Sequence, residues 1–125
     1  MAPRTGRGIS VIVGFGTYLA QVAEVAIDTD GQVRVDRVIC AVDCGKIVNP
    51  NIVVSQIEGG TIFGLTAALF GEITIKGGRV EQGNFDTYKS LRIDDAPKLE
   101  VHLVESTGAP GGIGELATAA AARRW

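Results

Sequence analysis

One carboxylate in this chain stands out by its surroundings as a group that could do chemistry. Residues 107–115 form a glycine-rich segment that ends at Glu115. Glycine lets the backbone approach a neighbouring group closely, so the segment suits a loop that presses against another molecule or another part of the fold. From residue types alone, a loop carboxylate with no chemical role is the simpler interpretation of Glu115.

The cysteines and the histidine do not predict a metal site. Cys40 and Cys44 are the two cysteines, their spacing differs from CxxC, and no second pair completes a zinc or iron–sulfur site. Cys40 falls in an apolar strand pattern, which favours a buried thiol, whereas Cys44 precedes a turn and could be more accessible. His102 points outward in an alternating strand pattern, as a solvated residue would. We therefore expect no metal ligands.

Composition limits the chain to ordinary globular classes. Its 125 residues fit one domain, with 46% hydrophobic residues, 21% charged residues and a net charge of -2. That charge gives no reason to expect a nucleic acid or an anionic membrane as partner. The longest uncharged segment, residues 59–71, is short for a membrane span, and the N-terminal residues lack the apolar run of a signal peptide. These features give no reason to expect export, so the expected location is the cytoplasm or is left open, since a fragment could have lost its signal peptide.

Alternating apolar and polar residues predict the strands of a sheet, which would hold Glu115, the cysteines and His102 in position. Residues 9–13 form a short β-prone run, apolar residues alternate over 18–28 and 33–42, and the turn signal at 29–31 makes the last two a hairpin. A change of phase between Val35 and Val38 indicates a bulge. Residues 98–104 alternate with Leu99, Val101 and Leu103 inward. Residues 72–75 and 80–82 predict a second hairpin, and 83–97 a loop.

A long helix is predicted between these strands. Asn49 suits the N-cap, Pro50 the first helical position and Gly71 the stop, which gives a helix over about residues 50–70. Gly59, Gly60 and Gly64 would each cost about 1 kcal/mol relative to alanine inside it. They suggest close packing, most simply against another part of this domain. The expected fold is α+β, a single domain with an antiparallel sheet packed against one long helix.

Three segments, taken in order, carry a family resemblance. They are residues 14–25 (GFGTYLAQVAEV), residues 42–65 with VDCG, NP, QIEGG and FGL, and residues 109–115 (APGGIGE). Together they resemble the C-terminal region of the molybdopterin-binding large subunits of xanthine dehydrogenase and aldehyde oxidase-type hydroxylases. The isoquinoline 1-oxidoreductase beta subunit and aldehyde dehydrogenase branch is the most similar. The resemblance covers nearly all of residues 6–115.

The resemblance implies an activity, a cofactor and site residues. Such enzymes hydroxylate aldehydes or N-heterocycles with water, and electrons leave through an iron–sulfur subunit. By position, Glu115 is the general base, which must lie within hydrogen-bond reach of the proton it accepts. Gln56 matches a glutamine that contacts the pterin of the molybdenum cofactor, and its amide can both donate and accept. Gln21 matches another cofactor-contacting position, on a strand.

Two departures from the family predict an incomplete enzyme. The family subunit is several times longer, and its other part supplies most of the cofactor pocket and substrate funnel. After Glu115 the sequence diverges, and residues 116–125 are expected to be disordered or truncated. We therefore expect the isolated chain to be inactive, to lack the cofactor and to need the remainder of the subunit as partner. The alternatives are a free-standing, non-catalytic binding domain and a gene remnant.

Self-association is a further expectation. A segment cut from a larger subunit exposes apolar surface, which favours a homo-oligomer. The helix face around Gly60 and Gly64, or an unpaired strand edge, is the expected contact.

Overall fold

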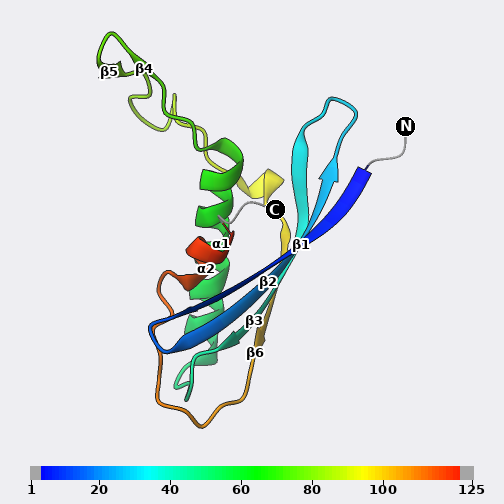
Figure 1. The fold of residues 1–125 in the computed structure, drawn as a ribbon, viewed down its shortest axis with the longest axis vertical. Coiled ribbons are helices and arrows are strands. Elements are labelled where there is room, and N and C mark those ends of the chain that lie inside the picture. The colour runs from blue at the N-terminus through cyan, green and yellow to red at the C-terminus, as the bar shows by residue number, and fades with distance from the viewer. Residues whose placement is uncertain (1–3, 122–125) are drawn as a thin grey trace.

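A mixed four-stranded sheet forms the centre of the molecule. In the computed structural model, which describes residues 4–121, the sheet consists of β1 (Arg4–Gly14), β2 (Thr17–Ile27), β3 (Val33–Asp43) and β6 (Lys98–Leu103), in the order β1-β2-β3-β6 (Figure 1). The first three strands pair antiparallel, as predicted. In contrast, β6 pairs parallel to β3. Helix α1 (Pro50–Phe70) carries the chain back along the sheet, so β6 starts from the same end as β3.

The predicted bulge lies on β3 at Asp36. Glu24 pairs with Arg37 and Val25 pairs with Val35, which leaves Asp36 without an opposite residue on β2. The extra residue keeps Val35 and Val38 on the buried side although they are three positions apart. The change of phase in the sequence is therefore confirmed as a bulge.

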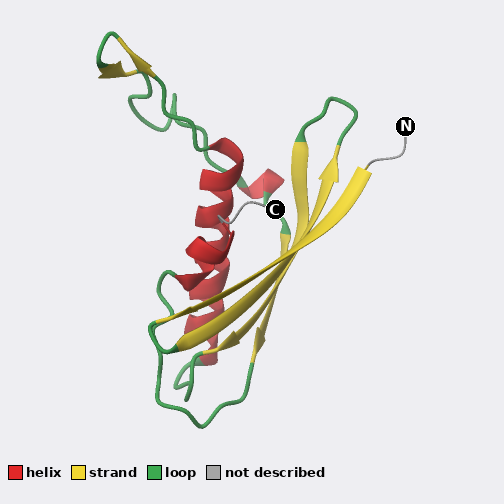
Figure 2. Ribbon diagram, in the orientation of Figure 1, coloured by secondary structure: helices red, strands yellow, loops and turns green. Residues whose placement is uncertain are grey.

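Two helices cover one face of this sheet. Helix α1 and the short α2 (Leu116–Ala121) lie on the same side of the strands (Figure 2). The predicted α+β architecture with one main helix is confirmed. The core between these layers contains Leu19, Val38, Val42, Ile57, Leu65 and Leu116, all at most 2% exposed.

The predicted ends of α1 are confirmed. The side chain of Asn49 accepts hydrogen bonds from the backbone N–H groups of Asn51 and Ile52, and Pro50 is the first helical residue. The helix ends before Gly71, which has φ -65° and therefore does not use a left-handed cap. By length and composition alone α1 could also cross a membrane, contrary to the expectation from uncharged runs. The core helix of a soluble protein passes the same test, so this is weak evidence for a membrane.

Beyond α1 the chain leaves the body of the molecule. Strands β4 (Ile75–Lys76) and β5 (Arg79–Val80) form the predicted second hairpin at the tip of a projecting segment (Figure 1). Gly77 and Gly78 form its turn with φ +57° and +76°, the left-handed values that a two-residue hairpin turn requires. The chain returns through the 3-10 turn η1 (Ile93–Asp95) to β6.

Helix α2 corrects two expectations. Residues Leu116–Ala121 are helical, and Leu116, Ala117, Ala120 and Ala121 are buried, so the described part of the tail is not disordered; residues 122–125 lie outside the described range. A Cβ built on Gly60 would lie 3.0 Å from Ala117 Cβ, and one on Gly64 would lie 2.8 Å from Ala121 Cβ. The Gly60–Gly64 face is therefore already covered by α2 and cannot be a self-association contact.

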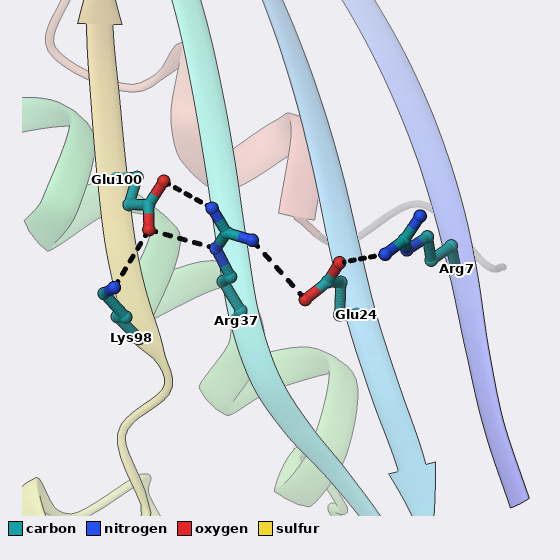
Figure 3. A network of polar contacts seen from close by, with 5 residues as sticks. All are labelled: Arg7, Glu24, Arg37, Lys98 and Glu100. Atoms are coloured by element: carbon teal, nitrogen blue, oxygen red, sulfur yellow. Dashed lines mark hydrogen bonds and ion pairs between the residues drawn. The ribbon is translucent and has the colours of Figure 1, made fainter.

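A ladder of alternating charges crosses all four strands on the face turned away from the helices (Figure 3). Arg7 pairs with Glu24 at 2.9 Å, and Arg37 lies between Glu24 at 3.9 Å and Glu100 at 2.6 Å. Lys98 completes the ladder at 3.1 Å from Glu100. The hydrogen bonds from Arg37, followed by the one from Lys98, lower the pKa of Glu100 to about 2.

The ladder predicts how stability depends on pH. Because the folded-state pKa of Glu100 is below its ordinary value of 4.5, its contribution is present above about pH 4.5 and is lost as pH falls towards about 2. Chemical denaturation should show Glu100→Gln less stable than the wild type at neutral pH, with the gap closing across that window. Glu105→Gln, which removes an exposed carboxylate, is the control. A gap that stays constant down to pH 2 would contradict this role of Glu100.

Candidate functional site

Three loops meet at one end of the sheet, and backbone hydrogen bonds join them. The glycine-rich segment 107–115 lies between the β1–β2 turn and the loop that follows β3. Gly112 N donates to Phe15 O at 2.8 Å, Gly111 N donates to Cys44 O at 2.8 Å, and Lys46 N donates to Gly108 O at 3.0 Å. The three segments that carry the family resemblance are therefore neighbours in space, and the segment that leads to Glu115 is attached to both of the others.

Close backbone contacts explain the glycines in these loops. Gly45 has φ +72°, and a Cβ built on it would overlap the carbonyl group of Ala109. A Cβ on Gly111 would overlap Thr17 Oγ1 and the backbone of Gly16, and one on Gly112 would lie 2.8 Å from Phe15 Cβ. As expected, glycine permits close backbone contact at these positions. The contacts include those with the other loops of the same chain.

Gln56 and Glu115 are both exposed. A Cβ built on Gly114 would lie 3.8 Å from Gln56 Nε2, so the Gln56 amide is beside the residue that precedes Glu115. The carbonyl oxygen of Glu115 accepts from Thr118 N at 3.1 Å and Ala119 N at 3.4 Å at the start of α2. The backbone of Glu115 is thereby held, and the residue is exposed.

Gln21 is not part of this surface. Its side chain is 1% exposed and lies in the core between β2 and α1, where Nε2 donates to Thr61 Oγ1 at 2.9 Å and to Cys40 Sγ at 3.4 Å. Within the described residues its Oε1 is buried without a hydrogen-bond partner. In this structure Gln21 connects the sheet to α1 and, through a hydrogen bond from Nε2 to Ala117 O at 3.5 Å, to α2, and its contact with the cofactor stays a prediction.

Within residues 4–121, no group of three or more His, Cys, Asp or Glu side chains could hold a metal ion. Both cysteines are free and buried, and burial raises the pKa of each thiol. Cys40 is buried as predicted, whereas Cys44, expected to be more accessible, is only 5% exposed. His102 is exposed on β6, as expected.

Sequence reasoning missed the residues that join α2 to α1. Thr118 Oγ1 donates to Gly60 O at 3.1 Å, and this contact positions the first turn after Glu115 against the helix that carries Gln56. The sequence did contain the pattern of this short helix, because residues 116, 117, 120 and 121 recur at the spacing of one helical face.

Comparison with known proteins identifies the family. Residues 6–97 match the molybdopterin cofactor-binding domain family. The chain is 36% identical over 116 residues to the isoquinoline 1-oxidoreductase subunit beta of Brevundimonas diminuta, covering 89% of this chain and 15% of that protein. It is 35% identical over 106 residues to the membrane-bound aldehyde dehydrogenase [pyrroloquinoline-quinone] of Gluconacetobacter polyoxogenes, covering 84% and 14%.

A solved structure supports the same family assignment as these two relatives. Quinoline 2-oxidoreductase from Pseudomonas putida 86 superimposes with a TM-score of 0.78 at 26% identity, covering 85% of this chain and 14% of that one. The chain belongs to the molybdopterin cofactor-binding domain family and resembles part of a molybdenum hydroxylase large subunit. It spans about 15% of the length of the curated relatives it matches.

The exposed residues fit one edge of a molybdopterin site. The Gln56 amide can donate and accept, as the edge of a pterin ring requires, and the Glu115 carboxylate can accept a proton. Gly114, which lies between them, has no side chain to obstruct a bulky ligand. Both side chains offer hydrogen-bonding groups, which fit the organic part of the cofactor.

Proposed function

We propose that this chain is the part of a molybdenum hydroxylase that supplies the general base and one cofactor contact. The observation that carries the proposal is the position of Gln56 beside Gly114, next to Glu115, on one exposed surface. Membership of the molybdopterin cofactor-binding family supports the choice of cofactor. The proposed substrates are aldehydes or N-heterocycles.

Each residue has a separate task in this proposal. The cofactor, when bound, supplies the redox chemistry that removes two electrons from the substrate. Gln56 orients the pterin edge through its amide. Glu115 takes up a proton at its carboxylate, and the bonds that join loop 107–115 to Phe15 and Cys44 keep that carboxylate in place.

The rest of the site has to come from partners. We infer that the remainder of the large subunit supplies the other walls of the cofactor pocket and the substrate funnel, and that an iron–sulfur subunit takes up the electrons. The chain's coverage of about 15% of its relatives, and the naming of one of them as a subunit beta, support this inference.

The isolated chain is therefore expected to be inactive. Protein purified from a host that makes molybdopterin should reduce no artificial electron acceptor with aldehydes or N-heterocycles, and it should contain far less than one molybdenum per chain. Metal analysis and an acceptor-reduction assay measure these two quantities. Acceptor reduction by the isolated chain that disappears in Glu115→Gln would contradict the need for a partner.

A second candidate function is self-association through β1. This edge strand has eleven residues, and Ile9, Val11 and Val13 are 57–69% exposed on its outer side. A long, apolar, unpaired edge is a template for pairing with a second copy. With the Gly60–Gly64 face covered, the β1 edge is the contact that we propose for a homodimer.

Light scattering tests this contact. The wild-type chain should have a dimer mass at micromolar concentration, and Val11→Lys should shift it towards the monomer because the charge lies on the pairing edge. Tyr18→Lys is the matched control, since Tyr18 is similarly exposed, at 58%, but lies on β2, where both neighbouring strands are paired with it. A monomer mass for the wild type would show that this contact does not form.

A further inference from the structure

Helix α1 contains three glycines, and contacts among residues 4–121 explain two of them. Gly60 and Gly64 are required by α2, because a Cβ on either would meet Ala117 or Ala121. A Cβ built on Gly59 would meet nothing within 4 Å. Glycine in a helix interior is unfavourable because it loses more backbone entropy than alanine. Within residues 4–121, no neighbouring group needs the space that Gly59 leaves.

Gly59 also lies on a distinctive part of the helix surface. It is exposed and comes three residues after Gln56 and four before Phe63, so these residues are neighbours on one helix face. Phe63 is 70% exposed. The next residue, Gly60, accepts the hydrogen bond from Thr118 in the first turn after Glu115. A bare stretch of helix backbone is thus flanked by an amide and an aromatic ring, and it lies close to Glu115.

This combination fits a flat ligand better than a second helix. Two helices that approach closely at a glycine normally have another small residue one turn along. Here Phe63 occupies that position and projects from the surface. A planar heteroaromatic ring, in contrast, can lie on the glycine, form hydrogen bonds with the amide at its edge and touch the phenyl ring at its other side.

We propose that Gly59 is the floor of a platform on which the pterin ring system of the cofactor lies, with Gln56 at its polar edge and Phe63 at its apolar edge. This proposal rests on the proposed function and extends it to two residues with no assigned role. Alanine at position 59 would place a methyl group in the plane that the ring occupies, while making the free helix more stable.

Nuclear magnetic resonance of the isotope-labelled 125-residue chain tests the platform. We expect titration with millimolar pterin-6-carboxylate to shift the Gly59 amide and Gln56 side-chain signals. Gly59→Ala should bind this probe about tenfold more weakly or worse, yet melt at a higher temperature than the wild type. Ser55→Ala, an exposed change on the same helix that removes an atom, should raise the melting temperature and leave binding unchanged.

The outcomes separate this proposal from the one on which it rests. No shift in the wild type would overturn both the platform and the cofactor contact of Gln56. Equal binding by the wild type and Gly59→Ala would overturn the platform alone. A lower melting temperature in Gly59→Ala would mean that the chain itself needs this glycine, which also overturns it. Binding of pyrroloquinoline quinone without binding of the pterin would overturn the choice of ligand.

Discussion

Replacing Gly45 by alanine is expected to lower the free energy of unfolding by about 2–4 kcal/mol, the sum of two costs. Gly45 has φ +72°, a left-handed conformation that strains any residue with a Cβ. The added Cβ would also overlap the Ala109 carbonyl, so the loop that leads to Glu115 would have to move. The hydrogen bonds from Lys46 and Gly111 cross this same contact and would weaken together.

A second glycine separates these two costs. Gly31 has φ +80° in the β2–β3 turn, and a Cβ built on it would meet nothing within 4 Å. Gly31→Ala should therefore show the conformational strain alone, about 1–2 kcal/mol. Urea denaturation of both variants measures the difference. Equal losses at Gly31 and Gly45 would mean that the contact with Ala109 contributes nothing to holding the loop.

Local chemistry made α1 and the β2–β3 hairpin predictable. Asn49, Pro50 and Gly71 mark the helix ends by capping preferences that act over a few residues. The alternation of strands and the phase change near Asp36 likewise depend on near neighbours, and the bulge lies where the pattern shifts. In such segments the residue pattern and the observed structure agree to within a few positions.

Long-range features could not be predicted in the same way. The parallel pairing of β6 depends on where the chain returns after α1 and the projecting hairpin, a path that the alternation at Leu99 does not encode. Helix α2 has six residues, too few to be stable alone, and it forms because Gly60 and Gly64 give it a surface on which to pack. The position of the Gln21 side chain in the core beside Thr61 was likewise not predictable from its strand pattern, and its contact with the cofactor stays a prediction.

Glu115→Gln is expected to reduce hydroxylation by about a hundredfold or more once the chain is part of a complete subunit. The amide has nearly the shape of the carboxylate but cannot accept a proton at neutral pH. Because Gln56 and the backbone bonds of loop 107–115 remain, the cofactor should stay bound. The effect should therefore appear in turnover and not in cofactor content.

Turnover per bound molybdenum in a hybrid enzyme tests the role of Glu115 most directly. In the hybrid, residues 6–115 replace the matching segment of the Brevundimonas diminuta isoquinoline 1-oxidoreductase subunit beta, which is 36% identical to this chain. We predict that the hybrid binds molybdenum and turns over. Glu115→Gln should keep the metal and lose turnover by about a hundredfold or more, while Glu105→Gln changes neither. Undiminished turnover in Glu115→Gln at equal molybdenum content would contradict the assignment of Glu115 as the general base.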